Sequence, residues 1–215
     1  MHSCVKSCRE VQSGNMTEPT QEGQLNSHPG FFSELIRFAL IALCIVLPIR
    51  LYIAQPFIVS GSSMDPTFVN GEYLIVDELT YHFENPERGE VIIFKFPQDT
   101  SKFFIKRIIG LPGETVKIQG GVITIINAQN PDGFALDESY LTQPTNSKVQ
   151  ITLKDNEYFV MGDNRPSSSD SRIWGPLPED LIVGRAFLRL LPIEKANLFP
   201  GLHTFETTQS ATSTQ

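Results

Sequence analysis

Cysteine is scarce in this chain of 215 residues and is confined to its first part. The three cysteines are Cys4, Cys8 and Cys44, and none follows residue 44. The main domain can therefore form neither a disulfide nor a thiolate metal site, and we expect it to need no metal and no cofactor. Cys4 and Cys8 with His2 could bind zinc, but their polar, Gly/Ser/Thr-containing surroundings favour a disordered tail.

An excess of positive charge is also lacking. The chain has 17 Lys and Arg against 24 Asp and Glu, a net charge of -7, which argues against a nucleic-acid partner. Hydrophobic residues make up 40% of the chain and charged residues 19%. That composition fits one globular domain with a real core, plus tails.

One long apolar run stands near the N-terminus. Residues 1–30 form a polar, aperiodic segment that predicts a flexible tail, and residues 31–58 predict a transmembrane anchor. Leu35–Ala54 supplies the roughly 20 residues that a spanning helix needs, if Arg37 and Arg50 extend their charges to the two interfaces. A buried soluble helix would need a polar face, and a cleavable signal peptide would need a small-x-small site at its end. The run has neither.

Lysine and arginine are distributed unevenly around this run. Lys6, Arg9 and Arg37 precede or open it, whereas no Lys or Arg lies between Arg50 and Arg88. By the positive-inside rule, the N-terminus is then cytoplasmic and the C-terminal domain extracytoplasmic, in a single-pass protein of the cell membrane.

A long helical periodicity is missing after residue 58. Residues 59–200 instead predict a mainly β, antiparallel and partly barrel-like domain, followed by a disordered tail at 201–215. Gly120 and Gly121 separate two strand-like runs and predict a hairpin. The other expected strands are 73–76, 91–96, 103–109, 157–161 and 181–191, with loops at 127–147 and 162–180.

The stretch "SGSSMDPTF" at 60–68 follows the apolar run and offers three serine hydroxyls. A serine becomes a nucleophile only when a neighbouring base removes its proton. Histidine is the usual base, but only four are present, and His82 alone falls in a polar loop of the main domain. A lone loop histidine is usually a solvated side chain, so a Ser-His-Asp triad is not favoured.

Lys106 in "FFIKRIIG" is the more unusual residue. Strand alternation places it on the face of Phe104 and Ile108, with Arg107 on the other face. Such a lysine either protects an edge strand from aggregation or is desolvated, which lowers its pKa and makes it a base near neutral pH. The strand alone leaves both explanations open.

Four stretches in this order resemble the bacterial type I signal peptidase (leader peptidase) family. They are "SMDPT", "RGEVIIF", "FIKRIIGLPGE" and "MGDNRPSSSDSRIWGP", and the resemblance runs from the apolar run to about Leu191. It implies a membrane-anchored serine endopeptidase that removes N-terminal signal peptides from exported preproteins. The implied partners are these signal peptides and the lipid bilayer.

The resemblance implies a role for particular residues. The serine before methionine, Ser63, would be the nucleophile and Lys106 the general base of a Ser-Lys dyad. Ser168 matches the position that hydrogen-bonds the lysine and orients it. Two structural ion pairs are implied as well, Arg107 with Asp163 and Asp170 with Arg172.

The oxyanion hole departs from one branch of the family, in which a serine two residues before the nucleophile donates its hydroxyl. That position is Gly61 here. The main-chain N–H of Ser63, with help from around Gly61, would then bind the oxyanion. Shallow apolar pockets would select small residues at the first and third positions before the cut. Their matching wall positions are Phe57, Val59, Met64, Leu74, Ile93 and Ile105.

Two other readings compete with this one. The first is that the chain is another Ser-Lys protease on a similar scaffold, such as an SOS-repressor-type autoprotease or a conjugation-specific peptidase. The repressor type would need an N-terminal DNA-binding domain, where this chain has a short tail and an apolar run. The second is a membrane-tethered β module that only binds partners, which leaves Lys106 and the "GDNR" segment without a role.

Overall fold

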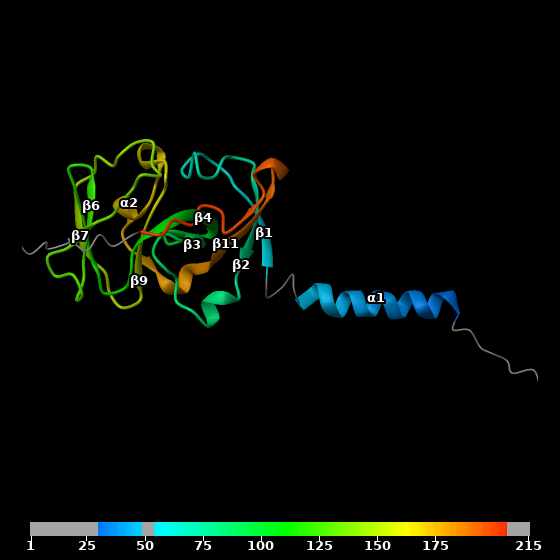
Figure 1. The fold of residues 1–215 in the computed structure, drawn as a ribbon. Coiled ribbons are helices and arrows are strands. Elements are labelled where there is room, and N and C mark those ends of the chain that lie inside the picture. Colours follow the sequence, from blue (N-terminus) through cyan, green and yellow to red (C-terminus); the bar gives the residue numbers. More distant parts are fainter. Residues whose placement is uncertain (1–29, 49–53, 206–215) are drawn as a thin grey trace, which may run out of the picture. The chain divides into compact units, whose positions relative to one another are not determined.

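The computed structural model describes residues 30–48 and 54–205 (Figure 1). The chain divides into two compact units, Met1–Ala42 and Leu43–Gln215. The first contains most of helix α1 (Phe31–Pro48), and the second contains the β domain. The tail predictions at 1–29 and 206–215 fall outside the described residues.

Helix α1 has 18 residues and is apolar on all sides. Nine of its large apolar side chains, from Phe32 to Val46, are each at least half exposed. Within the described ranges, no helix combines the length and the apolarity that crossing a membrane requires.

The predicted anchor extends too far at its C-terminal end. Ala54–Ile58, which we predicted as part of it, is strand β1 and pairs antiparallel with β2 (Tyr73–Asp77). β1 is the outermost strand of its sheet, and an edge strand tolerates Pro56, which cannot donate a ladder hydrogen bond. The apolar run therefore belongs to two different structures, because apolar residues are common in strands as well as in helices.

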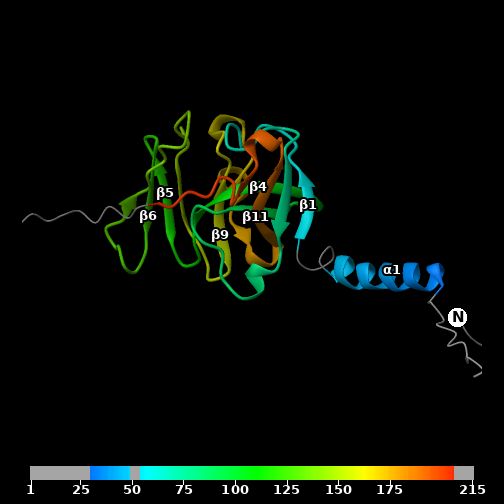
Figure 2. The same ribbon diagram turned by 45° about the vertical axis from the view of Figure 1, so that its right-hand side comes forward.

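The larger sheet of the second unit contains eight antiparallel strands in the described chain. Their order is β1-β2-β11-β3-β4-β9-β10, and β12 pairs with β11 (Figures 1 and 2). The further bounds are β3 (Val91–Phe96), β4 (Asp99–Gly110), β9 (Glu157–Met161), β10 (Leu177–Pro178), β11 (Ile182–Leu191) and β12 (Asn197–Leu198).

The smaller sheet has the order β7-β6-β5-β8. Its strands are β5 (Thr115–Gln119), β6 (Val122–Ile126), β7 (Phe134–Ala135) and β8 (Val149–Thr152). The predicted hairpin is confirmed: Gly120 and Gly121 connect β5 to β6 with φ of 61° and 85°, a conformation that favours glycine.

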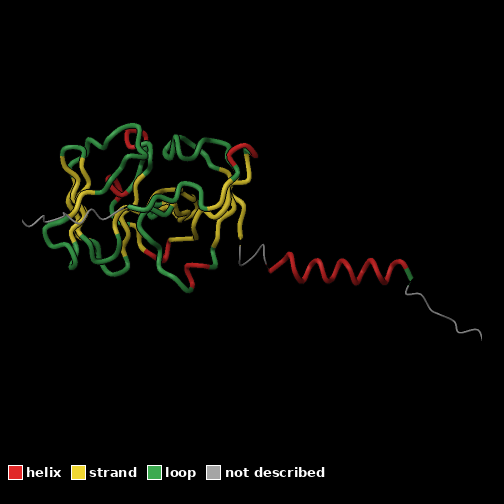
Figure 3. Tube along the Cα trace, viewed as in Figure 1, coloured by secondary structure: helices red, strands yellow, loops and turns green. Residues whose placement is uncertain are grey.

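The mainly antiparallel β class is confirmed, whereas the barrel-like closure is not. The strands at the two ends of the larger sheet, β1 and β10, are not paired with each other in the described part of the chain. Figure 3 shows the two sheets as separate groups of yellow strands joined by loops. Helix α2 (Ser171–Trp174) and four 3₁₀ turns add short helical pieces. These turns are η2 (Thr80–His82), η3 (Arg165–Ser167), η4 (Glu179–Leu181) and η5 (Ile193–Lys195).

The segment 201–205, predicted as the start of a disordered tail, packs against the β domain. The Gly201 carbonyl accepts a hydrogen bond from Arg107, and the His203 ring lies 4.5 Å from that of Tyr140, centroid to centroid. Phe205 contacts both rings. The aromatic side chains in "GLHTF" give this segment its ring contacts with the β domain.

We predict that the chain ending at Pro200 is less stable than the chain ending at Phe205. Removing 201–205 takes away an acceptor of the buried Arg107 guanidinium and the ring contacts of Tyr140, a loss of about 1–3 kcal/mol. Urea unfolding of the two truncated chains measures this difference. Equal midpoints would mean that 201–205 contributes nothing to the fold.

Candidate active site

Ser63 lies in the long connection between β1 and β2. Main-chain hydrogen bonds from Val59 to Glu72 (2.9 Å) and from Gly71 to Val59 (2.8 Å) close the base of this connection. Met64 and Phe68 are 1% and 0% exposed and hold it against the core, which leaves Ser63 half-buried. Met64, a predicted pocket wall, is therefore a core residue beneath the nucleophile candidate and does not line the cavity.

Lys106 lies in the middle of β4, which is paired with β3 on one side and β9 on the other. The edge-strand explanation is therefore wrong. The side chain shares its face with Phe104, whose ring centroid is 5.3 Å from Nζ, as the strand alternation predicted. Only 3% of Lys106 is exposed.

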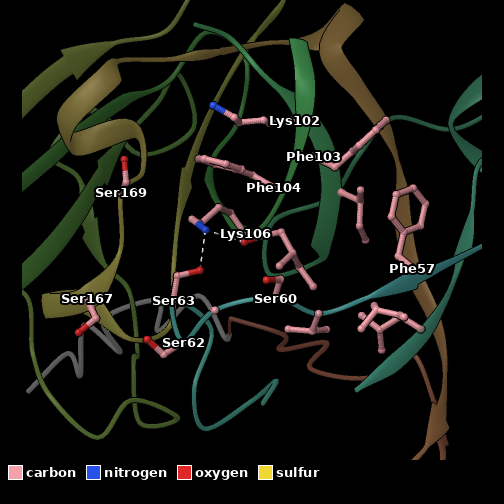
Figure 4. Close-up of a pocket in the computed structure, with 16 residues that line it drawn as sticks. Phe57, Ser60, Ser62, Ser63, Lys102, Phe103, Phe104, Lys106, Ser167 and Ser169 are labelled. Carbon is pink, nitrogen blue, oxygen red and sulfur yellow. Dashed lines mark hydrogen bonds between the residues drawn. The ribbon is translucent and has the colours of Figure 1, made fainter. Parts of the chain in front are cut away.

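The Lys106 amine contacts the hydroxyl of Ser63. Nζ donates to Ser63 Oγ at 2.8 Å and to the Ile105 carbonyl at 2.8 Å (Figure 4). Burial lowers the pKa of Lys106 to about 8, against the opposing charges of Asp170 and Asp163. An appreciable fraction of the amine is then neutral near physiological pH, and its lone pair could accept the serine proton along the same line.

The two histidines among the described residues, His82 and His203, are not placed to serve as this base. His82 is exposed in η2, where its Nδ1 lies 3.0 Å from the Glu78 carbonyl. His203 lies on Tyr140. In the described part of the chain, neither ring has a contact with Ser63.

Arg107, on the opposite face of β4 from Lys106, forms a buried ion pair with Asp163. Nε and Nη2 donate to the two carboxylate oxygens at 2.8 and 2.6 Å, and both side chains are at most 1% exposed. Thr67 donates to the same carboxylate at 2.6 Å. The pair thus joins β4, the loop after β9 and the Ser63 connection.

Asp170 and Arg172 form the second ion pair, with two distances of 2.7 Å. The other contacts of this pair close the 162–172 segment on itself. Asp170 accepts from the Gly162 N–H at 3.1 Å, and Arg172 donates to the Arg165 carbonyl at 2.7 Å. The segment is therefore held rigidly beside the Ser63 connection.

Ser168 is buried in this segment, but its hydroxyl has no hydrogen-bond partner among the described atoms. The expected bond from Ser168 to Lys106 is therefore not present in this structure. Gly162 explains the tight packing here, because a Cβ at this position would lie 2.3 Å from Ser168 Oγ and 2.4 Å from the Ser63 carbonyl oxygen.

A cavity of about 520 Å³ opens at the Ser63–Lys106 pair. Five of the six predicted wall residues line it, all except Met64. The lining residues that the sequence reasoning missed include Lys102, Phe103 and Phe104, seen above Lys106 in Figure 4. They directly precede Ile105, so strand periodicity could have indicated Phe103, whose ring meets that of Phe57 at 5.4 Å.

Gly61 adopts a φ of 94°, and its N–H donates to Oδ1 of Asn70 at 3.0 Å. This N–H is therefore already engaged and is not free for an oxyanion. The Ser63 N–H has no partner within the described residues. As for metals, no group of three potential ligand side chains is found in the same ranges.

Comparisons with known proteins identify the family to which the chain is related. The family model described as "Signal peptidase, peptidase S26" matches residues 32–191. The chain is 36% identical to a probable signal peptidase I-1 of Synechocystis sp., over 77% of this chain and 85% of that protein. It is 34% identical to a signal peptidase I of Bacillus amyloliquefaciens, over 82% and 96% of the two chains.

A solved signal peptidase I from Enterococcus faecalis is 30% identical and covers 47% of this chain and 97% of its own. Its TM-score of 0.41 is too low to support a structural argument. The family model, by contrast, spans most of the β domain together with the apolar helix. The chain belongs to the signal peptidase family of serine peptidases, peptidase S26.

Proposed function

We propose that this protein is a membrane-anchored endopeptidase that removes N-terminal signal peptides from exported preproteins, with Ser63 and Lys106 as its catalytic dyad. One observation carries the proposal: the 2.8 Å contact between the buried Lys106 amine and the Ser63 hydroxyl at the end of a cavity. Family membership and the names of the relatives support the substrate class.

The dyad would act in two half-reactions. Neutral Lys106 takes the proton of Ser63 Oγ as the oxygen attacks the scissile carbonyl. When the tetrahedral intermediate collapses, the lysine ammonium gives this proton to the leaving amine, and the mature protein departs. Lys106 then deprotonates a water molecule, which hydrolyses the acyl-enzyme ester and frees Ser63.

The developing oxyanion would be bound by the N–H of Ser63, since the N–H of Gly61 is engaged by Asn70. Ser168 is proposed to orient the lysine once substrate is bound, because its buried hydroxyl lies beside Gly162 and is unpartnered. The two ion pairs are proposed to hold the 162–172 segment in place and not to take part in the chemistry.

The specificity is proposed to be for small-x-small sequences. The cavity wall formed by Val59, Ile93 and Ile105 is apolar, and Phe57 and Leu74 narrow it further. Such shallow apolar walls favour alanine and exclude bulky side chains.

The membrane anchor is proposed to begin at Phe31. The large, exposed apolar side chains of α1 support this proposal, because such a surface is costly in water and favourable in lipid. The Lys and Arg distribution around the run supports a cytoplasmic N-terminus with the catalytic domain on the outer side of the plasma membrane.

Ser63→Ala is expected to abolish cleavage of a purified preprotein in detergent, lowering kcat by on the order of 10⁴-fold or more. The nearby Ser62→Ala, whose hydroxyl does not contact Lys106, should keep substantial activity. Gel analysis of preprotein and mature product measures both. Equal inactivity of the two variants would place the nucleophile or the oxyanion site elsewhere.

Activity should rise with pH. The protonated amine cannot accept the serine proton, so kcat/KM is low below the pKa of Lys106 and increases as the pH passes about 8. Lys106→Arg should be inactive at every pH, because a guanidinium stays protonated. A pH profile of the wild type and the variant tests this. Near wild-type cleavage by Lys106→Arg would exclude the dyad.

Replacing alanine by phenylalanine at the third position before the cut should reduce kcat/KM by roughly 100-fold, while valine is accepted more readily. The apolar side chains of Val59, Ile93 and Ile105 leave little room for a ring. A series of preproteins that differ only at this position provides the measurement. Efficient cleavage of the phenylalanine substrate would contradict the pocket assignment.

A further inference from the structure

Some main-chain N–H groups of the turn at 61–65 have partners, whereas those of Ser62, Ser63 and Met64 have none within 54–205. The Gly61 N–H donates to Asn70, and the Asp65 N–H donates to the Ser62 carbonyl at 3.2 Å. The Ser63 N–H has no such partner within 54–205. If this N–H is to bind an oxyanion, something else must fix its direction, because an exposed turn does not hold a free donor in place by itself.

Asn164 contacts the main chain on both sides of the Ser63 α-carbon. Its side-chain Nδ2 donates to the Ser62 carbonyl at 2.9 Å, and its main-chain N–H donates to the Ser63 carbonyl at 3.0 Å. One residue thus binds the peptide group before Ser63 and the peptide group after it. The sequence reasoning quoted Asn164 within the "GDNR" stretch and gave it no role.

The first of these contacts determines where the Ser63 N–H points. The Ser62 carbonyl and the Ser63 N–H belong to the same planar peptide group, and this group is trans. In a trans peptide the C=O and the N–H point in opposite directions. Holding the oxygen with Nδ2 therefore aims the N–H away from Asn164, and a donor on the carbonyl also polarises the group and strengthens its N–H as a donor.

We propose that Asn164 is a positioning residue of the oxyanion site, which holds the peptide group between Ser62 and Ser63 so that the Ser63 N–H faces the substrate carbonyl oxygen. This inference rests on the proposed function. Asn164 also links the two halves of the site, the oxyanion donor and the base. Asn164 follows Asp163 and Lys106 precedes Arg107, so the Arg107–Asp163 pair sets the distance between the oxyanion donor and the base.

The test uses two uncharged substitutions, Asn164→Ala and the near-isosteric Asn164→Leu. Both keep the main-chain N–H and remove the Nδ2 donor, while the Ser62 carbonyl retains the Asp65 N–H. We expect kcat to fall about 10–100-fold, less than the loss of an entire oxyanion donor, with KM within about twofold of wild type. The pH midpoint assigned to Lys106 should not move.

A second readout separates positioning from a general structural effect. Ser63 Oγ adds to the carbonyl carbon of a substrate-like peptide aldehyde, its proton passes to Lys106, and the C=O π electrons move onto the carbonyl oxygen, which becomes the hemiacetal oxyanion. The affinity of the aldehyde should fall in proportion to kcat, whereas the affinity of the non-covalent product peptide should stay unchanged. The concentration of active sites is titrated with the aldehyde, and kcat is calculated from this concentration. This corrects for any variant protein that is not folded.

Asn156→Ala is the matched control, because Asn156 is exposed in the turn before β9, away from the site, and should behave as wild type. Wild-type kcat and aldehyde affinity in a folded Asn164 variant would overturn the inference, as would a change confined to KM. Failure of the proposed function gives a different result: Ser63→Ala would then cleave preprotein as well as the wild type does.

Discussion

The buried ion pair of Arg107 and Asp163 is the contact on which the rest of the site depends. Both side chains are at most 1% exposed, so removing either one would leave an uncompensated charge in the core. Arg107 also donates to the Gly89 and Gly201 carbonyls, and Asp163 accepts from Thr67. Five segments of the chain therefore meet at one guanidinium–carboxylate pair.

The same arrangement explains how a buried lysine keeps a low pKa beside two aspartates. Asp163 and Asp170 each raise the pKa of Lys106, yet burial outweighs them and lowers it to about 8. Each aspartate is bound to its own arginine, whose positive charge opposes that of the carboxylate. The two ion pairs thus support the chemistry electrostatically while they hold the loop.

Periodicity and motif order predicted the parts of the structure that depend on local sequence. The face of Lys106, the Gly120–Gly121 hairpin and the antiparallel β class follow from alternation and turn chemistry, and each is present. The residue at which the helix ends within the apolar run could not be predicted from these patterns. Ala54–Ile58 continues the apolar run with Gln55 and Pro56 in it, and its pairing with β2 shows that it is a strand.

The contacts that were not predicted depend on how the chain packs in three dimensions and not on local pattern. Met64 faces the core because Phe68 and the β1–β2 connection turn it inward, and no local pattern separates a core methionine from a pocket methionine. Gly61 was expected to help bind the oxyanion, but Asn70 engages its N–H across the turn. Asn164 reaches Ser62 and Ser63 over about a hundred residues, which sequence spacing does not reveal.

The central claim is that Lys106 activates Ser63 by accepting its proton. It is tested most directly by the rate at which a serine-reactive penem acylates the protein, with the modified residue identified by mass spectrometry. The account predicts one adduct, on Ser63, whose formation rate rises as the pH passes about 8 and is lost in Lys106→Ala. An adduct on another serine, or a Ser63 adduct that forms equally fast in Lys106→Ala, would contradict it.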